Sequence, residues 1–356
     1  MTNAYGKWEV LDSLDEGGQA WIYMVRDSSG EREGQFVLKR LKNPGRLERF
    51  RREIEAGLRL QHKNAVEVID YDLEGEKPFF VTPHYQGGNL AQAEPYNSSD
   101  LGRRLDLFGQ VCDGVLAAHS EGVIHRDLKP ENIFVYGDRY GDVVVGDFGL
   151  CLIEGEPRIT GTSEAVGPRL YMAPELEDGR LEEATYASDV YSLGKLLYWL
   201  ISGGRAFSRE KHRTEDFNLI TITKEPWMEH VNRLLDHMIV ADPDNRWPLD
   251  VVRDEVVLTK RLVVGEYNPV GPDVQARCHY CGIGGYMLIG RDRASLEKDN
   301  FIGAGQPDAW RVLVCNFCGH VQKFRPDIGG RLSPMRTTPW ETPPKELPPA
   351  TRPYPL

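Results

Sequence analysis

The sequence predicts an α+β protein built from more than one unit. Strand-like apolar runs dominate residues 1–85, helical periodicity dominates 101–262, and two Cys-x-x-Cys pairs follow. A chain of 356 residues also exceeds what one hydrophobic core usually holds, so several units are expected.

Composition and charge exclude several classes of protein. The net charge of −11 argues against a protein that coats nucleic acid. No apolar run approaches the roughly 20 residues that span a bilayer, and Met1–Val10 lacks the pattern of a secretion signal. We therefore expect a soluble, cytoplasmic protein that binds neither membrane nor nucleic acid.

The first elements should form a small sheet with one helix. Strands within Tyr5–Val25 flank adjacent glycines, which predicts a hairpin whose backbone can approach a ligand closely. A further strand is expected at Gln35–Leu41, and Val66–Tyr71 and Pro78–Thr82 should close the sheet.

The helix of this first part is expected at Arg46–Leu60. Phe50, Ile54 and Leu58 recur at i, i+4 spacing and should share its packed face. Gly57 lies in the helix interior, where glycine costs about 1 kcal/mol relative to alanine. The helix is therefore expected to be weak and to need help to dock.

Three longer helices are predicted downstream. Leu101–Ser120 is amphipathic, Ser188–Ile201 is mostly apolar, and Leu249–Leu262 is the last periodic stretch. Asp189 stands at the start of the second helix, where it should act as the cap.

A polar loop at Ile124–Ile133 organises the chain. It reads Ile-His-Arg-Asp-Leu-Lys-Pro-Glu-Asn-Ile and lies between apolar pairs. Asp127 could accept or orient a hydroxyl proton, Lys129 could neutralise negative charge, and Asn132 could offer an oxygen to a hard cation. These groups suit transfer of a charged group to a hydroxyl, and the alternative is a polar surface turn.

The ordered string from His125 to Asn132 resembles the catalytic loop of the eukaryotic-like Ser/Thr protein kinases. The family occurs in bacteria and eukaryotes, and a bacterial member is favoured. The resemblance runs from about Trp8 to Leu262. It implies a bilobal fold, with a β-rich N-lobe and hinge at 1–85 and a larger helical C-lobe at 86–263.

The resemblance also implies ATP and Mg²⁺ as cofactors and assigns residues to them. Lys39 would bind phosphate and pair with Glu53, while Asn132 and Asp147 would hold Mg²⁺. Asp147 opens the family's Asp-Phe-Gly motif. The resemblance places nine residues around the nucleotide: Gly17, Gly18, Ile22, Val37, Lys39, Thr82, Pro83, Tyr85 and Phe134.

Further roles follow from the same resemblance. Asp189 would hold the backbone of the catalytic loop, and Arg246 would form an ion pair with Glu175. Arg126 would bind a phosphate on the activation segment. The candidate acceptors of that phosphate are Thr160, Thr162 and Ser163.

The sequence departs from the family pattern at several positions. Asp15 and Ala20 replace the outer glycines of the hairpin, and Val37 stands where alanine is common. Pro168 replaces a threonine that favours Ser/Thr acceptors. These departures bear on nucleotide affinity and on the choice of acceptor.

Four cysteines predict a metal site. Cys278, Cys281, Cys315 and Cys318 form two Cys-x-x-Cys-Gly knuckles, and four thiolates suit tetrahedral Zn²⁺. A redox dithiol pair or an iron site are the alternatives. The pattern resembles a zinc ribbon at 277–325, after a linker at 264–276 and before a disordered, proline-rich tail at 326–356.

The sequence therefore predicts an ATP- and Mg²⁺-dependent protein kinase that modifies Ser/Thr hydroxyls of protein substrates. The alternative is a pseudokinase or adaptor whose zinc ribbon binds a partner. Asp15, Ala20, Val37 and Gly57 favour the alternative, whereas retention of the catalytic-loop and metal-binding residues favours the enzyme. The ribbon is expected to be a folding clip or a docking surface.

Overall fold

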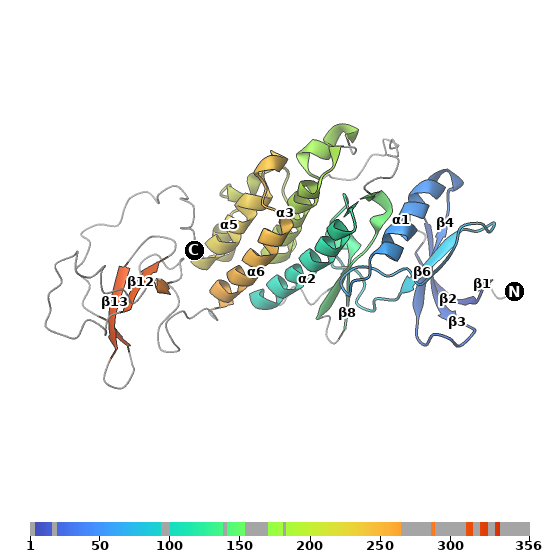
Figure 1. Ribbon diagram of the computed structural model, residues 1–356, viewed down its shortest axis with the longest axis horizontal. Coiled ribbons are helices and arrows are strands. Elements are labelled where there is room, and N and C mark those ends of the chain that lie inside the picture. Colours follow the sequence, from blue (N-terminus) through green and yellow to red (C-terminus); the bar gives the residue numbers. More distant parts are fainter. Residues whose placement is uncertain are drawn as a thin grey trace. The chain divides into compact units, whose positions relative to one another are not determined.

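The computed structural model describes residues 4–15, 20–93, 100–137, 141–153, 170–180 and 183–264, and the backbone of four strands beyond them (Figure 1). The chain divides into a larger unit, residues 1–217 and 234–257, and a smaller unit, residues 218–233 and 258–356. Among the described residues, no helix combines the length and apolar character that a bilayer crossing requires.

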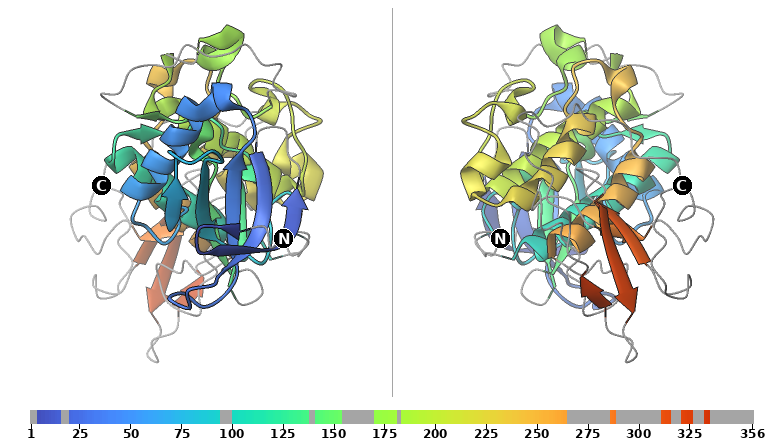
Figure 2. Two further views of the ribbon diagram at one scale, coloured as in Figure 1. Left: turned by 90° about the vertical axis from the view of Figure 1, so that its right-hand side faces the viewer. Right: turned by 90° about the vertical axis from the view of Figure 1, so that its left-hand side faces the viewer.

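A six-stranded sheet forms the first part of the larger unit, and its blue strands lie side by side in Figure 2. In spatial order it contains β1 (Ala4–Tyr5), β2 (Trp8–Asp15), β3 (Ala20–Asp27), β4 (Phe36–Leu41), β6 (Phe79–Pro83) and β5 (Asp70–Asp72). All neighbours are antiparallel. The predicted sheet is confirmed, except that the strand expected from Val66 begins only at Asp70.

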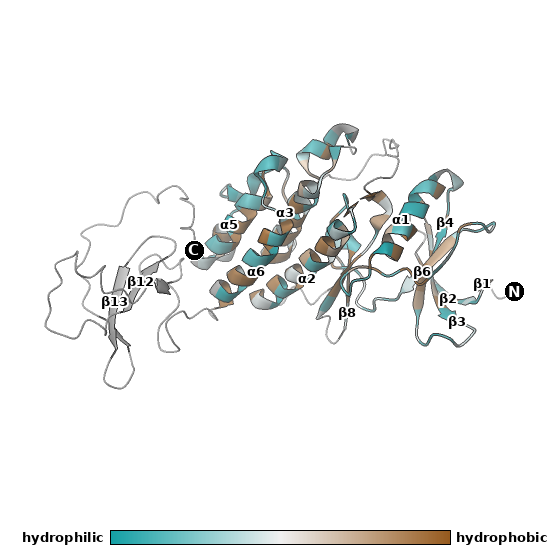
Figure 3. Cartoon of the chain, viewed as in Figure 1, coloured by the Kyte–Doolittle hydropathy of each residue, from teal (hydrophilic) through white to brown (hydrophobic). Residues whose placement is uncertain are grey.

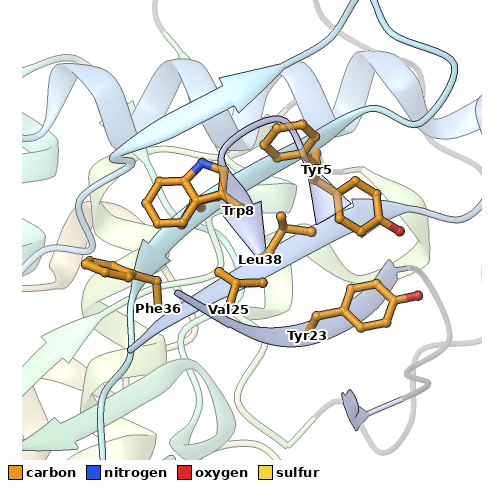
Figure 4. Packing of buried hydrophobic residues seen from close by; sticks show 8 residues of the cluster. Tyr5, Trp8, Tyr23, Val25, Phe36 and Leu38 are labelled. Carbon is orange, nitrogen blue, oxygen red and sulfur yellow. The ribbon is translucent and has the colours of Figure 1, made fainter. Parts of the chain in front are cut away.

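Aromatic residues fill one face of this sheet (Figure 4). Successive strand residues point to opposite faces, so Tyr23 and Val25 of β3 pack with Phe36 and Leu38 of β4. Trp8 is fully buried among them, and its indole Nε1–H donates to Asp70 Oδ2 at 2.7 Å. Because this face is closed by packing, the opposite face is the one left for a ligand.

Helix α1 (Leu47–Arg59) follows a short 3-10 turn, Pro44–Arg46, and packs on the sheet. Phe50 and Ile54 are buried against Val68 and Phe80, as the apolar spacing predicts. The expectation for Leu58 is wrong, because its side chain is 44% exposed. Gly57 occupies the packed face in its place.

The close approach of the chain at Val68 explains Gly57. A Cβ atom added at Gly57 would lie 2.4 Å from Val68 Cγ2, far inside van der Waals contact. Gly57 therefore marks tight docking of α1, and the expectation that it signals a poorly docked helix is wrong.

We expect Gly57→Ala to destabilise the protein by up to about 2 kcal/mol, although alanine is the better helix former. Overpacking costs about 1–3 kcal/mol and the gain in helix propensity is about 1 kcal/mol. Urea unfolding of the variant, and of Gly57→Ala combined with Val68→Ala, measures the effect. The pair should couple favourably, because the smaller side chain makes room. A more stable single variant would contradict the packing explanation.

The second part of the larger unit is mainly helical, and apolar residues gather along α2 and α3 in Figure 3. Helix α2 (Leu101–Ser120) has the predicted bounds, and α3 (Tyr186–Ser202) is buried along most of its length. Helices α5 (Glu229–Met238) and α6 (Leu249–Val264) follow. Residues 234–238 and 249–257 of these helices belong to the larger unit, and α4 (Leu219–Thr223) belongs to the smaller unit. This confirms a β-rich part followed by a helical part.

Helix α3 begins two residues earlier than expected, at Tyr186. Thr185 is its N-cap residue, and the Ser188 hydroxyl accepts a hydrogen bond from the Thr185 N–H at 3.1 Å. The prediction that Asp189 caps the helix is therefore wrong. Asp189 lies within the first turn, with its carboxylate bound to another segment.

The smaller unit contains a four-stranded antiparallel sheet. Its strands are β11 (Tyr286–Leu288), β12 (Arg311–Cys315), β13 (Val321–Pro326) and β14 (Leu332–Pro334), in that order. The strand expected before the second cysteine pair is confirmed as β12. Strand β14 pairs with β13 inside the stretch that was expected to be a disordered tail.

Most of the predicted metal module lies outside the described residues. This holds for Cys278, Cys281 and Cys318, and for most of the expected linker and tail. Within the part of the chain that the structure describes, no three His, Cys, Asp or Glu side chains gather as metal ligands.

Candidate active site

The polar loop is held between two short strand pairs. Before it, β7 (Val123–Ile124) pairs with β10 (Leu152–Ile153), and after it β8 (Ile133–Tyr136) pairs with β9 (Asp142–Val145). Pro130 opens a single 3-10 turn, Pro130–Asn132, where its missing N–H costs nothing. The loop therefore has fixed ends on both sides.

Asp127, Lys129 and Asn132 form one cluster, as the sequence predicts. Asp127 Oδ2 accepts from Lys129 Nζ at 2.8 Å and from Asn132 Nδ2 at 3.0 Å. Asn132 Nδ2 also donates to the Asp127 carbonyl at 2.7 Å. With its amide nitrogen used in this way, Asn132 keeps its amide oxygen for a hard cation.

Asp189 binds the backbone of the loop through hydrogen bonds. Its buried carboxylate accepts the backbone N–H groups of His125 and Arg126, each at 2.9 Å, and lies 2.9 Å from His119 Nε2. Burial would raise the pKa of Asp189, but the hydrogen bond with His119 and the other donors hold it below its usual value. The role that the resemblance implied for Asp189 is confirmed.

The hydrogen bonds from Asp189 stabilise a strained backbone conformation at Arg126. Arg126 has a φ of 67°, in the left-handed region that non-glycine residues rarely enter. Two charge-assisted hydrogen bonds to one carboxylate can offset a cost of about 1–3 kcal/mol. The strain sits one residue before Asp127, so it helps to set the direction of that side chain.

Lys39 of β4 and Glu53 of α1 form a mostly buried ion pair, with Nζ and Oε1 2.7 Å apart. Burial would lower the pKa of Lys39, but the carboxylates of Glu53 and Asp147 raise it well above its usual value. Burial raises the pKa of Glu53 although Lys39 opposes this. Lys39 therefore stays charged, and α1 is tied to the sheet at this point.

Asp147 lies opposite the loop in a left-handed conformation, with φ 59° and ψ 62°. Burial would raise the pKa of its carboxyl, but nearby cations, Lys39 first among them, hold it below its usual value. The Gly146 N–H donates to the Asn132 carbonyl at 2.9 Å, which brings the segments of Asn132 and Asp147 together. An ionised carboxylate and an amide oxygen in this arrangement suit Mg²⁺.

One pocket of about 260 Å³ collects these groups. The Lys39–Glu53 ion pair, the polar loop and Asp147 all contribute side chains to its lining. Its lining residues are Ala20, Ile22, Lys39, Leu41, Arg46, Arg49, Phe50, Glu53, Asp127, Lys129 and Asp147. The sequence reasoning missed Arg46 and Arg49, whose only signal was the arginine-rich start of α1.

Of the residues predicted around the nucleotide, Ile22, Val37 and Thr82 lie on strands β3, β4 and β6. Ile22 is paired with Lys39, and Val37 with Thr82, in the strand register. Pro83 ends β6. Gly17 and Gly18 lie outside the described residues.

Residues 84–88, which follow β6, form backbone hydrogen bonds with β8. The Gly87 N–H donates to Val135 O, and the Val135 N–H donates to Gly88 O, each at 3.0 Å. Tyr85 stacks on Phe134, with ring centroids 5.8 Å apart. This places two predicted base-binding residues, Tyr85 and Phe134, side by side.

The predicted ion pair between Arg246 and Glu175 is confirmed. Arg246 Nη1 and Nη2 donate to the two carboxylate oxygens at 2.7 and 2.8 Å. Arg126 donates from Nη2 to the Cys151 carbonyl at 3.0 Å. Its predicted phosphate partners lie outside the described residues, so that expectation stays a prediction.

The sequence was compared with protein-family models and with known proteins, and the matches cover the residues of this site. Residues 8–256 match the family model of the protein kinase domain. The chain is 31% identical over 209 residues to the serine/threonine-protein kinase PrkC of Bacillus subtilis, which is 58% of this chain and 32% of PrkC. It is 37% identical over 210 residues to PknL of Mycobacterium bovis, which is 57% of this chain and 51% of PknL.

A plant relative matches a longer part of the chain than the two bacterial relatives do. The chain is 31% identical over 259 residues to CBL-interacting serine/threonine-protein kinase 5 of Arabidopsis thaliana, which is 68% of this chain and 56% of that protein. The matched region thus spans between 32% and 56% of the length of these three relatives.

Proposed function

The chain belongs to the protein kinase family, and we propose that it transfers the γ-phosphoryl group of ATP to Ser/Thr hydroxyls of protein substrates. One observation carries the proposal. The Lys39–Glu53 ion pair, the Asp127–Lys129 pair and Asp147 all line the same pocket. Relatives named serine/threonine-protein kinases support the choice of acceptor.

Each side chain then has a role that its contacts allow. Asp127 orients the acceptor hydroxyl and takes its proton, and Lys129 beside it neutralises charge on the transferred group. Lys39 binds phosphate oxygens and is positioned by Glu53. Asn132 and Asp147 would hold Mg²⁺, which would supply neutralisation of phosphate charge.

The non-catalytic alternative is less well supported by the geometry. A pseudokinase has no need to keep a buried lysine paired and a catalytic carboxylate oriented, yet both are found here. The feature that favoured the alternative at Gly57 has a packing explanation. Asp15 and Ala20 remain as departures and bear on how phosphate is bound.

We also propose that residues 277–325, which belong to the smaller unit, form a zinc ribbon. The strand register places Tyr286, the first residue of β11, opposite Cys315, the last residue of β12. In the sequence Cys281 precedes β11 and Cys318 follows β12, so both pairs connect to the same end of the sheet. Four thiolates brought together would suit structural Zn²⁺. Partner docking on this unit and a cytoplasmic location stay predictions.

The test of the kinase proposal is phosphoryl transfer itself. Purified full-length protein with labelled ATP, Mg²⁺ and generic protein acceptors should label Ser or Thr, identified by phosphoamino-acid analysis. Asp127→Ala should lose this labelling, because Asp127 is the carboxylate of this loop that lines the pocket. Equal labelling by both proteins would show that the activity does not arise from this site.

A further inference from the structure

One lysine is buried in the middle of α3, and none of the roles above uses it. Lys195 is only 3% exposed, and its neighbours in the helix are buried as well. Lysine is almost never buried in this way without partners. Its amine donates to the carbonyl oxygens of Phe207 and Arg209, at 2.5 and 3.0 Å, and lies 3.5 Å from the centroid of the Phe207 ring. The side chain therefore binds the backbone of a segment that follows α3.

These backbone contacts do not depend on the charge of the amine. Burial lowers the pKa of Lys195 to about 7, although the Glu210 carboxylate opposes this shift. The ammonium has three N–H groups and the neutral amine has two, which is the number of carbonyl oxygens that the amine meets here. The contribution of Lys195 is therefore a pair of hydrogen-bond donors inside the protein.

The segment that Lys195 binds has a strained backbone. Arg209 has a φ of 57°, in the left-handed region that non-glycine residues rarely enter. Such a conformation is costly and persists only where surrounding contacts hold it. Lys195 binds the carbonyl of this residue, and the Tyr191 hydroxyl donates to the carboxylate of the next residue, Glu210, at 3.1 Å. Two side chains of α3 thus stabilise the backbone at residues 209 and 210.

The strained residue carries a side chain that reaches a second segment. Arg209 Nη2 donates to Glu177 Oε2 at 2.6 Å. Glu177 follows Glu175 by two residues in one 3-10 segment, and Glu175 is bound by Arg246. The segment is therefore held at two positions. One is bound by Arg246, and the other by Arg209, whose backbone conformation Lys195 supports.

The chain leads from this segment to the polar loop. Residues 170–180 are described without a gap, and burial together with the Glu131 carboxylate raises the pKa of Tyr171. Glu131 belongs to the polar loop, so Tyr171 lies near that loop. A protein whose hydroxyl reaches Asp127 is far larger than the pocket of about 260 Å³. Such an acceptor must also contact residues around the loop, and Tyr171 is one of these.

We propose that Lys195 is a positioning residue for the protein acceptor. By binding the backbone at residues 207 and 209, it sets Arg209 to pair with Glu177, and this pair fixes the segment beside the polar loop in the form that binds the acceptor. The inference rests on the proposed function. Binding of ATP should not depend on Lys195, because Lys195, Arg209 and Glu177 do not line the pocket.

Steady-state kinetics tests this role. Full-length wild type and Lys195→Met are compared with ATP and Mg²⁺, and with casein and myelin basic protein as acceptors. Methionine is similar in length and has no donor, so KM for the acceptor should rise at least about fivefold. Turnover at saturating acceptor, and the slow hydrolysis of ATP without acceptor, should stay within about twofold of wild type, because only acceptor binding is lost.

Two further variants show whether Lys195 acts through the pair of Arg209 and Glu177. Asparagine adopts the left-handed region but is too short to reach Glu177, so Arg209→Asn removes the pair and preserves the backbone. Glu177→Gln removes the charge. Each should raise KM for the acceptor up to about fivefold, the upper range for a largely exposed pair. Lys195→Met combined with Glu177→Gln should have a KM within about twofold of Lys195→Met alone, because both act on one contact.

Glu183→Gln is the matched control. Glu183 lies a few residues beyond Glu177, its side chain is 48% exposed, and it pairs with Arg180 at 3.4 Å. The chemical change is the same as in Glu177→Gln, but no contact with the segment after α3 is removed. KM for the acceptor should therefore stay within about twofold of wild type.

The outcomes separate this inference from the kinase proposal. An unchanged KM in Lys195→Met, or effects of Lys195→Met and Glu177→Gln that multiply in the double variant, would show that Lys195 does not act through this pair. An equal loss of turnover with and without acceptor would show a general structural role and contradict the inference as well. If Lys195→Met gives no thermal unfolding transition, Arg209→Asn and Glu177→Gln decide, and an unchanged KM in both overturns the inference. No phosphoryl transfer by wild type would overturn the kinase proposal, and this inference with it.

Discussion

Asp147→Asn is expected to lower the rate of phosphoryl transfer by at least about a hundredfold, the usual effect of removing a key electrostatic group, while the fold persists. The carboxylate is held ionised by nearby cations, Lys39 first among them. An amide carries no charge, so it binds a divalent cation far more weakly. The loss should therefore appear as a lower rate of transfer together with a higher Mg²⁺ requirement.

Asparagine is the right replacement for a structural reason. Asp147 has a φ of 59°, and asparagine is one of the few residues that adopt this left-handed region readily. Alanine would add backbone strain to the loss of charge and confuse the two effects. The thermal midpoint of Asp147→Asn should therefore stay within a few degrees of wild type.

Asp142→Asn provides the matched control. Asp142 is exposed at the start of β9, in the strand that leads to Asp147. The same chemical change there should leave the rate unaltered. Equal turnover by Asp147→Asn and wild type, with both proteins folded, would contradict the assignment of Asp147 as a metal ligand.

The geometry of the polar loop could be predicted from sequence because its side chains come from a short, contiguous string. Asp127, Lys129 and Asn132 are so close in the chain that fixed loop ends bring them together. Lys39 and Glu53 lie on different elements, and only the resemblance predicted their contact, which the ion pair confirms.

Other features depend on packing that no local pattern reports. Helix propensity predicts that Gly57 weakens its helix, but propensity does not depend on Val68, which is adjacent to Gly57 only in the folded chain. The position of Asp189 at the start of a helical pattern predicts a cap, because capping depends only on neighbouring residues. Its carboxylate instead accepts hydrogen bonds from residues 63 and 64 positions away along the chain. No sequence pattern assigns Arg46 and Arg49 to the site, because they come to line the same pocket as Asp147 only in the folded chain.

Cys315→Ser is expected to abolish binding of one Zn²⁺ per chain and to unfold the C-terminal module alone. Structural zinc contributes about 10 kcal/mol or more of apparent binding free energy, and serine at neutral pH does not replace a thiolate ligand. The four strands of this module are only three to six residues long. So small a sheet has little core with which to compensate.

Kinase activity on a small generic substrate should survive in Cys315→Ser. The reason is the division of the chain, because Lys39, Asp127 and Asp147 all belong to the larger unit. Elemental analysis measures the metal, and limited proteolysis measures whether the strands from β11 to β14 become accessible. Cys112→Ala removes a buried thiol of the larger unit and should keep the zinc.

Each alternative for the four cysteines gives a different result in the same measurements. Iron in place of zinc identifies an iron site, and metal-free protein purified without chelators, with a reversible disulfide, identifies a redox pair. Either result contradicts the zinc ribbon. Loss of basal turnover in Cys315→Ser would instead show that the smaller unit supports the active form of the larger one. In that case zinc binding, which depends on four thiolates, would regulate a site built entirely from other residues.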